Sequence, residues 1–360
     1  MWGDIAIAFL LAFVTSFVAT PYTIRLAKRI GAVDRPIETR KIHKKITPRL
    51  GGLAVIAGFI VSIVYLFIVM TLENTINLKG PENYYIKLIG FFIGLVILEI
   101  VCFIDDLRGV PALVKLLAQT VAAFIVVQSG VVIDQINMTA LSQFGINEII
   151  SKIITIGWIV GITNAINLID GLDGLSSGIS LISCLSLLII FSLNGSPIIA
   201  TILVTALAGG IVGFMPFNVN PAKTFIGDTG TNFLGYSLSI ISILGVAKTY
   251  TAIVLIAPLI ILALPICDTI FAIFRRIIKE KSIKAIFNAD NGHIHHRLMK
   301  KGYTQKQAVF ILYGISAVFG MFAIILLESG LWKAISFALI VIAIAMIGYK
   351  DILKVKDEEI

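Results

Sequence analysis

Long apolar runs recur along almost the whole chain and constrain its fold more than any other feature. A transmembrane helix needs about 20 consecutive, mostly apolar residues. Eleven runs meet this description: 4–26, 50–71, 85–104, 111–130, 149–166, 175–193, 197–215, 232–247, 251–274, 308–327 and 331–349. Of the 360 residues, 58% are hydrophobic and only 14% are charged, which excludes an ordinary soluble domain. The sequence therefore predicts an all-α integral membrane protein, one domain over residues 1–360, with eleven transmembrane helices.

Basic residues are divided unequally between the two sides of this predicted bundle. Of the 29 Lys and Arg residues, 23 follow odd-numbered runs, five lie on the other side, and Arg25 falls within the first run. Because cytoplasmic loops carry the excess of Lys and Arg, the N-terminus is predicted outside and the C-terminus in the cytoplasm. Membrane orientation thus accounts for the net charge of +8, and the sequence lacks the aromatic and basic pattern of a nucleic-acid-binding protein.

Four polar clusters follow odd-numbered runs, so the same topology places all of them at the cytoplasmic face. They are CFIDDLRG with Asp105 and Asp106, NAINLIDGLDGLSSG with Asn164, Asn167, Asp170 and Asp173, KTFIGDTGTN with Phe225, Asp228 and Thr229, and NGHIHHRL with His293, His295, His296 and Arg297. Charged groups at a membrane boundary are costly unless they face protein, water or a ligand. The clusters are therefore candidate functional groups.

Each cluster also has a purely structural interpretation. An aspartate pair at a helix end can be a solvated boundary, and the Gly-rich segments can be turns. Adjacent helical residues point about 100° apart, so we expect one of Asp105 and Asp106 to act directly and the other to support it. The carboxylate and hydroxyl of GDTG suit Mg²⁺. The histidines lie among cations, which favours phosphate or sugar binding over a transition-metal site.

In this order, the four motifs resemble those of the polyprenyl-phosphate N-acetylhexosamine-1-phosphate transferase family, and the likeness covers nearly the whole chain. The segment VDRPIETRKIHKKITPRLGG at 33–52 also looks like the first cytoplasmic loop of that family. The sequence HIHH resembles the bacterial GlcNAc-1-phosphate branch, whereas the peptidoglycan translocase branch carries a Pro-x-His-His-His pattern.

The resemblance implies a role for each motif residue. Asp228 would be the Mg²⁺ ligand, with Mn²⁺ as a substitute ion, and Asp105 and Asp106 would be catalytic. The residues that would bind substrate are Asn167, Asp170, Asp173, Phe225, His293, His295, His296, Arg297 and one of Lys44 and Lys45. Phe225 would stack on uracil.

The implied reaction moves GlcNAc 1-phosphate from UDP-GlcNAc to undecaprenyl or another polyprenyl phosphate in the plasma membrane and releases UMP. UDP-GalNAc and UDP-MurNAc-pentapeptide are alternative donors. A soluble donor and a lipid acceptor together predict a groove between helices that opens to the bilayer. A secondary transporter is the alternative from another class, although its acids would lie near the bilayer midplane. An allylic prenyl-diphosphate enzyme would need D-D-x-x-D, and 105–109 reads DDLRG. The sequence is compatible with a homodimer.

Overall fold

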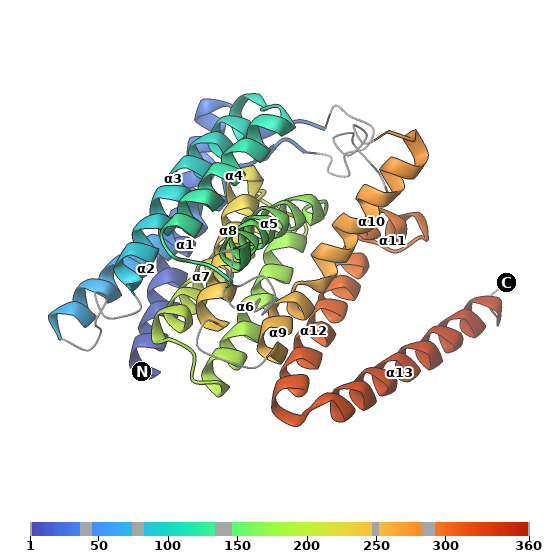
Figure 1. Cartoon of the computed structure of the whole chain (residues 1–360). Coiled ribbons are helices and arrows are strands. Elements are labelled where there is room, and N and C mark those ends of the chain that lie inside the picture. Colours follow the sequence, from blue (N-terminus) through green and yellow to red (C-terminus); the bar gives the residue numbers. More distant parts are fainter. Residues whose placement is uncertain are drawn as a thin grey trace.

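The computed structural model describes residues 2–36, 45–73, 83–133, 146–246, 252–282 and 292–358. Within these residues the chain forms a helical bundle with one two-stranded antiparallel sheet (Figure 1). The helices are α1 (Trp2–Ile30), α2 (Gly52–Leu72), α3 (Tyr84–Arg108), α4 (Ala112–Gln128), α5 (Ile146–Ile169), α6 (Leu175–Leu193), α7 (Ile198–Asn218), α8 (Gly227–Val246), α9 (Ala252–Ile261), α10 (Ala263–Glu280), α11 (Ile294–Lys300), α12 (Gln305–Ser329) and α13 (Leu331–Glu358). The strands are β1 (Val33–Asp34) and β2 (Thr47–Pro48).

The helices confirm an integral membrane protein. Among the described residues, α1, α2, α3, α5, α6, α7 and α12 are long and apolar enough to cross a membrane. Two shorter apolar helices are α4 and the Leu331–Ile344 part of α13. Ten of the eleven predicted runs coincide with one helix each, while the number of spans and their orientation stay predictions.

The predicted run 251–274 is not one helix, which corrects the sequence analysis. α9 ends at Ile261 and α10 begins at Ala263, with Leu262 in a turn between them. Pro265 lies in the first turn of α10. Because proline has no backbone N–H, Pro265 cannot donate to the carbonyl of Ile261, and an uninterrupted helix is broken there.

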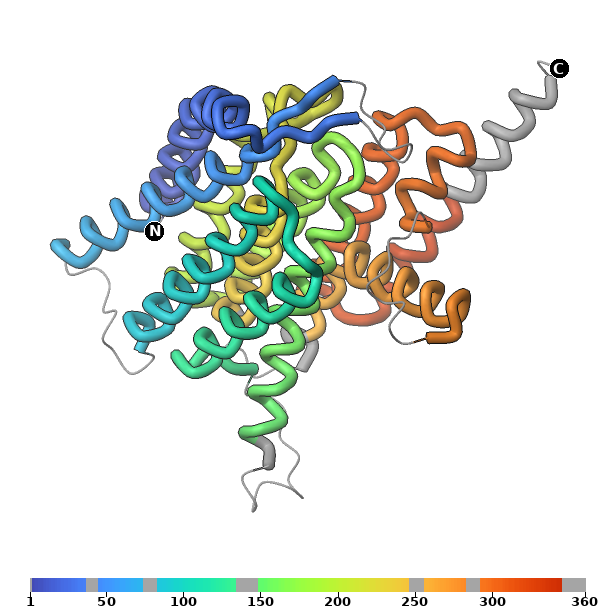
Figure 2. The backbone as a smooth tube through the Cα atoms, turned by 90° about the horizontal axis from the view of Figure 1, so that it is seen from above, coloured from blue at the N-terminus to red at the C-terminus, as the bar shows by residue number. Residues whose placement is uncertain are grey.

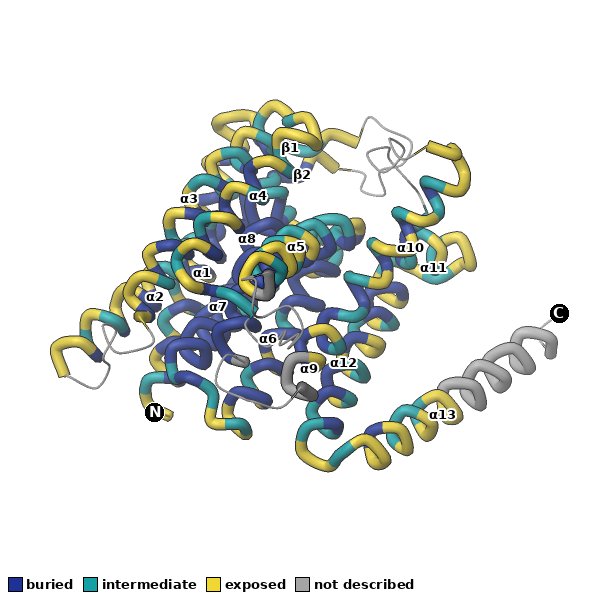
Figure 3. Tube along the Cα trace, viewed as in Figure 1, coloured by how far each residue is buried: buried dark blue, intermediate teal, exposed yellow. Residues whose placement is uncertain are grey.

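Burial is highest at the centre of the bundle and lowest on its outer helices (Figure 3). In the most apolar 18-residue window of each helix, 83% of the residues of α7 are buried but only 28% of those of α1. Large apolar side chains such as Leu10, Phe271 and Ile278 are exposed. An apolar outer surface around a buried centre is the arrangement that a lipid environment stabilises.

Glycines allow α1 to lie close against its neighbours. A Cβ at Gly209 or Gly213 of α7 would collide with the α1 backbone at Phe9 or Phe13, and one at Gly58 of α2 would collide with Ala12. In a membrane the hydrophobic effect does not drive helices together, so van der Waals contact between closely packed backbones supplies much of the energy of helix association.

One end of the bundle collects the segments that carry the polar motifs. Seen from above, the two strands (blue) extend toward the segments that lead into α8 (yellow) and α6 (light green) (Figure 2). The segment after β2 joins the chain before α8 through backbone hydrogen bonds: Phe225 N–H donates to Pro48 O at 2.8 Å, and Gly51 N–H to Phe225 O at 3.0 Å. This non-local pairing brings Arg49, which directly follows β2, to the start of α8.

Candidate active site

Asp228, in the first turn of α8, is the centre of a cluster of charged and amide side chains. Lys115 Nζ donates to its Oδ1 at 2.8 Å and Asn167 Nδ2 donates to the same oxygen at 2.7 Å. Arg49 Nη2 donates to Oδ2 at 3.1 Å. The partners come from α4, from α5 and from the segment after β2, so three separate parts of the chain meet at one carboxylate.

Asp106 holds the start of α8 in place. Its Oδ1 accepts from Asp228 N–H at 2.9 Å, and its Oδ2 accepts from Thr229 N–H at 2.9 Å and from the Thr229 hydroxyl at 2.7 Å. Gly227 has φ +75°, and a Cβ there would collide with Arg49 O and with the Asp106 carboxylate, so glycine is required. Asp106 thus satisfies N–H groups that a helix start leaves unpaired.

Asp105 points to a different partner. It forms an ion pair with Lys115, and its Oδ1 accepts from Val110 N–H at 2.7 Å. Lys115 therefore bridges Asp105 and Asp228. As helical geometry required, the two adjacent aspartates serve different parts of the site, Asp106 the helix start and Asp105 the lysine.

Arg49 carries its charge between two carboxylates. Its Nε lies 3.6 Å from Asp106 Oδ1, in addition to the contact with Asp228. Burial lowers the pKa of Arg49, but these carboxylates outweigh burial and raise it above its ordinary value. The guanidinium is consequently a fixed positive charge in the site.

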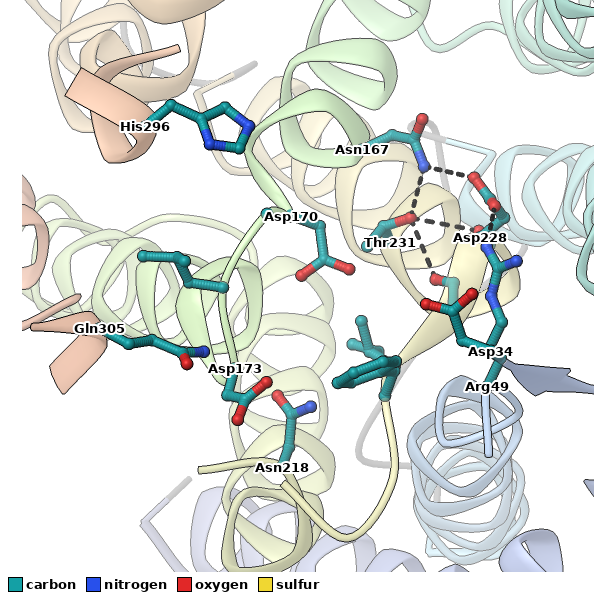
Figure 4. Close-up of a pocket in the computed structure, with 15 residues that line it drawn as sticks. Asp34, Arg49, Asn167, Asp170, Asp173, Asn218, Asp228, Thr231, His296 and Gln305 are labelled. Carbon is teal, nitrogen blue, oxygen red and sulfur yellow. Dashed lines mark hydrogen bonds and ion pairs between the residues drawn. The ribbon is translucent and has the colours of Figure 1, made fainter. Parts of the chain in front are cut away.

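A cavity of about 340 Å³ opens beside this cluster. Its walls are Asp34, Arg49, Asn167, Asp170, Gly171, Leu172, Asp173, Asn218, Phe225, Ile226, Gly227, Asp228, Thr231, His296 and Gln305. Asp170 and Asp173 stand on one side, opposite Arg49 and Asp228, and the Asp170 carboxylate points toward the middle (Figure 4). The cavity thus has an acidic side and a side with both charges.

The two aspartates of the LIDGLDG segment have different surroundings. Burial raises the pKa of Asp170 to about 7, although a hydrogen bond from Ser176 at 2.7 Å opposes the shift. Asp173 Oδ2 accepts from Asn220 Nδ2 at 2.8 Å and from Ala222 N–H at 3.0 Å. Asp173 therefore fixes the loop after α7, while Asp170 can exchange a proton near neutral pH.

The histidines of α11 and its N-cap do three different things. His293 Nδ1 lies 2.8 Å from Asp268 Oδ2 on α10, and Ile294 N–H donates to the same carboxylate at 2.9 Å. His295 is buried so tightly against Gly171 that a Cβ there would collide with the ring. Of the three histidines only His296 lines the cavity. His293 and His295 thus hold α11 in place behind the cavity wall.

His295 is neutral in this position. Burial, together with the nearby His296, lowers its pKa to about 3. Neither ring nitrogen has a hydrogen-bond partner among the described residues. The lowered pKa favours the neutral imidazole of His295 at neutral pH.

The basic candidates from the sequence are mostly outside the cavity. Arg297 and Lys45 are exposed and do not line it, and Lys44 lies outside the described residues. Among the residues that the structure describes, the cations at the site are Arg49 and Lys115, to which the motifs had assigned no role. Lys115 could have been recognised, because a lone lysine in an apolar run is a functional candidate.

Other residues of the site had no signal in the sequence. Asp34 and Arg49 reach the cavity only through the β1–β2 hairpin and its pairing with the chain before α8. Gln305, far along the chain, accepts a hydrogen bond from Asn220 at 2.9 Å. No local motif predicts such contacts.

A second cavity, of about 360 Å³ and almost wholly apolar, runs between α5 and the α9–α10 pair. Its walls are Ile154, Gly157, Trp158, Gly161, Ile162, Ala165, Leu259, Ile266, Thr269, Ile270 and Ile273. A Cβ at Gly157 or Gly161 would meet no atom within 4 Å. The groove ends near Ala165, two residues before Asn167, so it leads along α5 toward Asp228. It fits the predicted groove between helices.

The fold and the site together define a membrane-embedded protein whose polar cavity, lined by four aspartates and by Arg49, lies at one end of the bundle. The family model described as Glycosyl transferase family 4 matches residues 88–246. That stretch carries Asp105, Asp106, Asn167, Asp170 and Asp228.

Similar proteins extend the match to nearly the whole chain. A probable undecaprenyl-phosphate N-acetylglucosaminyl 1-phosphate transferase of Bacillus subtilis is 38% identical over 338 residues, which are 94% of this chain and 89% of that protein. A decaprenyl-phosphate N-acetylglucosaminephosphotransferase of Mycolicibacterium smegmatis is 29% identical over 95% of this chain and 87% of that protein. A phospho-N-acetylmuramoyl-pentapeptide-transferase of Wolbachia is 30% identical over 88% of this chain and 97% of that protein.

This chain belongs to glycosyl transferase family 4, the phosphotransferases that move N-acetylhexosamine 1-phosphate to a polyprenyl phosphate. The resemblance read from the four motifs is confirmed. The transporter and the allylic prenyl-diphosphate enzyme are no longer needed as alternatives.

Proposed function

We propose that the chain transfers GlcNAc 1-phosphate from UDP-GlcNAc to undecaprenyl phosphate, releasing UMP, at the cytoplasmic face of the plasma membrane. The observation that carries the proposal is the cluster of Arg49, Lys115 and Asn167 around Asp228, at the edge of a cavity and near the end of an apolar groove. The relative with 38% identity supports the choice of donor sugar and lipid, as does HIHH at 293–296.

The cavity suits a nucleotide sugar. Phe225 offers an aromatic face for uracil, and Asn218, Asp173 and Gln305 offer hydrogen-bonding groups beside it. Arg49 lines the cavity and supplies positive charge for the diphosphate, and Lys115 adds positive charge at the cavity edge through its contact with Asp228. Arginine and lysine favour phosphate because charge-assisted hydrogen bonds are about twice as strong as neutral ones.

A magnesium ion fits this set of residues if it enters with the diphosphate. Among the described residues no group of three or more His, Cys, Asp and Glu side chains could cage a metal alone. Mg²⁺ typically uses one or two carboxylates plus substrate phosphates and water. Asp228 would hold the ion, with Asp170 as a second carboxylate across the cavity. Bound Mg²⁺ would neutralise the diphosphate and make UMP a better leaving group.

The apolar groove suits the lipid acceptor. A polyprenyl chain lying between α5 and α10 would bring its phosphate to the end of α5, where Asn167 contacts Asp228. The outer face of α10 is apolar, with Phe271 and Phe274 exposed beside the groove-lining Ile270 and Ile273, so this face suits contact with lipid.

Transfer then requires mainly positioning and charge neutralisation, as in phosphoryl transfer generally. An oxygen of the lipid phosphate attacks the β-phosphorus of UDP-GlcNAc, the bond from that phosphorus to the bridging oxygen breaks, and UMP leaves. A phosphate monoester already carries close to two charges near pH 7, so a strong base is unnecessary. Asp105 orients Lys115, and Asp106 orients Asp228 through the start of α8.

The test is UMP release by the purified protein in detergent, with a short polyprenyl phosphate and Mg²⁺. UDP-GlcNAc, UDP-GalNAc and UDP-MurNAc-pentapeptide are offered separately. We expect acceptor-dependent UMP release with UDP-GlcNAc, abolished by a chelator and by Asp228→Ala but unaffected by Glu148→Gln at an exposed ion pair. Absence of UMP with every donor would contradict the proposal.

A further inference from the structure

Three amide side chains, of which Gln119 and Asn232 are buried and Asn164 is partly buried, lie one helical turn deeper in the bundle than Asp228. Asn164 Nδ2 donates to Gln119 Oε1, Gln119 Nε2 donates to Asn232 Oδ1 at 2.7 Å, and Asn232 Nδ2 donates to the backbone carbonyl of Asp228 at 2.8 Å. Gln119 is 2% exposed and Asn232 is fully buried. We call Gln119, Asn164 and Asn232 the amide triad.

The triad joins the same three helices that meet at Asp228. Each helix contributes one residue to each level: α4 gives Lys115 and Gln119, α5 gives Asn167 and Asn164, and α8 gives Asp228 and Asn232. The two members on each helix are three or four residues apart, which places them on the same helical face. A shift of any one helix would therefore disturb both levels together.

Backbone carbonyls at the two ends of the triad determine which group donates in each of its hydrogen bonds. Asn232 must turn its nitrogen to Asp228 O, because a carbonyl only accepts, and its oxygen is then left for Gln119. At the other end Asn164 Nδ2 also donates to Val160 O at 2.9 Å, so its nitrogen is the group that meets Gln119. Gln119 lies between the other two amides, whose orientations are set by their own contacts with backbone carbonyls. It therefore has to donate to Asn232 and accept from Asn164, and only one orientation of its amide does both.

Buried amides are costly unless every one is satisfied, and a satisfied polar network specifies one arrangement of the elements that it joins. We infer that the amide triad is a positioning device that sets the register of α4, α5 and α8, and so holds Lys115 and Asn167 at hydrogen-bonding distance from Asp228 during transfer. The inference rests on the proposed function and adds three positioning residues to it.

The decisive variant is Gln119→Glu, which keeps the size of the side chain. An ionised carboxylate only accepts hydrogen bonds, so Asn232 would have to turn its amide nitrogen toward the carboxylate at position 119. Its amide oxygen would then face the backbone carbonyl oxygen of Asp228, and the two oxygens repel each other. A protonated carboxyl can donate to Asn232 and accept from Asn164, as glutamine does. Burial raises the pKa of a carboxyl. The ratio of the variant's kcat to the wild-type kcat should therefore rise as the pH is lowered.

The experiment compares the wild type with Gln119→Glu, Gln119→Met, Asn232→Leu and the Gln119→Met/Asn232→Leu double variant, each normalised by the fraction folded. Thr120→Val is the matched control, because Thr120 is adjacent and its hydroxyl donates to Leu116 O of its own helix. We expect Gln119→Met to lower kcat by about 10- to 100-fold, as residues that orient a site typically do. The KM for the donor should change less than about twofold, and the double variant should be no worse than the poorer single variant.

Each outcome decides the matter. If the wild type releases no UMP, the proposed function fails. If the wild type is active but Gln119→Met retains its kcat within about twofold, the positioning role is refuted. A loss in Gln119→Glu that does not recover at low pH, in protein that remains folded, also refutes it.

Discussion

The contact between Asp106 and the start of α8 makes a prediction whose size follows from the structure. Asp106→Ala leaves three donors without partners: the N–H groups of Asp228 and Thr229 and the Thr229 hydroxyl. An unsatisfied buried donor costs about 1–3 kcal/mol, and the costs are not additive because water can enter. We expect a loss of about 3 kcal/mol in the free energy of unfolding, which lowers Tm by about 5 °C.

The same substitution should lower activity by more than the fraction unfolded explains. Asp228 carries its carboxylate on the backbone that Asp106 anchors, and a displacement of about 1 Å at a reacting centre can cost 100-fold in rate. The assays are thermal unfolding in detergent and UMP release on the same sample. Glu148→Gln, which removes an exposed ion pair with Lys152, is the control and should change neither value. If Asp106→Ala keeps both its Tm and its kcat close to those of the wild type, Asp106 does not position Asp228.

Three further predictions concern other parts of the site. Lys115→Met should lower kcat by about 100-fold while the protein stays folded, because Asp105 and Asp228 lose their shared cation; initial rates of UMP release measure this, and an unchanged rate would remove Lys115 from the mechanism. Because the pKa of Asp170 is about 7, its ionised fraction rises with pH, so kcat/KM should rise between pH 6 and pH 8 in the wild type and lose that component in Asp170→Asn. The raised pKa also means that the folded protein holds the Asp170 proton more tightly than the unfolded chain, so Asp170 contributes stability at low pH that is lost as the pH rises through 7. Tm measured between pH 6 and pH 8 should therefore fall less steeply with pH in Asp170→Asn than in the wild type. An identical slope in both proteins would contradict the raised pKa of Asp170. Gly161→Leu places a side chain in the apolar groove and should raise the KM for the polyprenyl phosphate with little effect on the KM for UDP-GlcNAc. Equal effects on both KM values would argue against a lipid groove. Gly314→Leu is the control, because Gly314 is an exposed helical glycine of α12 that does not line the groove.

The bundle and the meeting of the four motifs were predictable from the sequence. The lengths of the apolar runs predict the helices. The distribution of Lys and Arg predicts that all four polar motifs lie on the same side of the membrane, without any assumption about their function. The structure brings Asp106, Asn167, Asp228 and His296 to one end of the bundle, as that grouping required. The 100° rotation between adjacent helical residues agrees with the different partners of Asp105 and Asp106, whereas the expectation that one of them acts directly on the substrate stays a prediction.

The details that decide each role were not predictable, because they depend on contacts between distant parts of the chain. Arg49 reaches Asp228 only because Pro48 and Gly51 pair with Phe225. His293 turns to Asp268, and His295 packs against Gly171, although the motif treats all three histidines alike. The division of run 251–274 into α9 and α10 depends on Pro265, which cannot donate a hydrogen bond to the carbonyl of Ile261, and an average of hydropathy over a window does not register this.

The central claim is that sugar and β-phosphate move together onto the lipid. UDP-GlcNAc carrying a label in the β-phosphate and another in the sugar should be incubated with the purified protein and polyprenyl phosphate, and the lipid and aqueous phases should be counted separately. Both labels are expected in the lipid phase in equal amounts, matched by UMP in the aqueous phase. Sugar in the lipid without the β-phosphate, accompanied by UDP, would contradict the account.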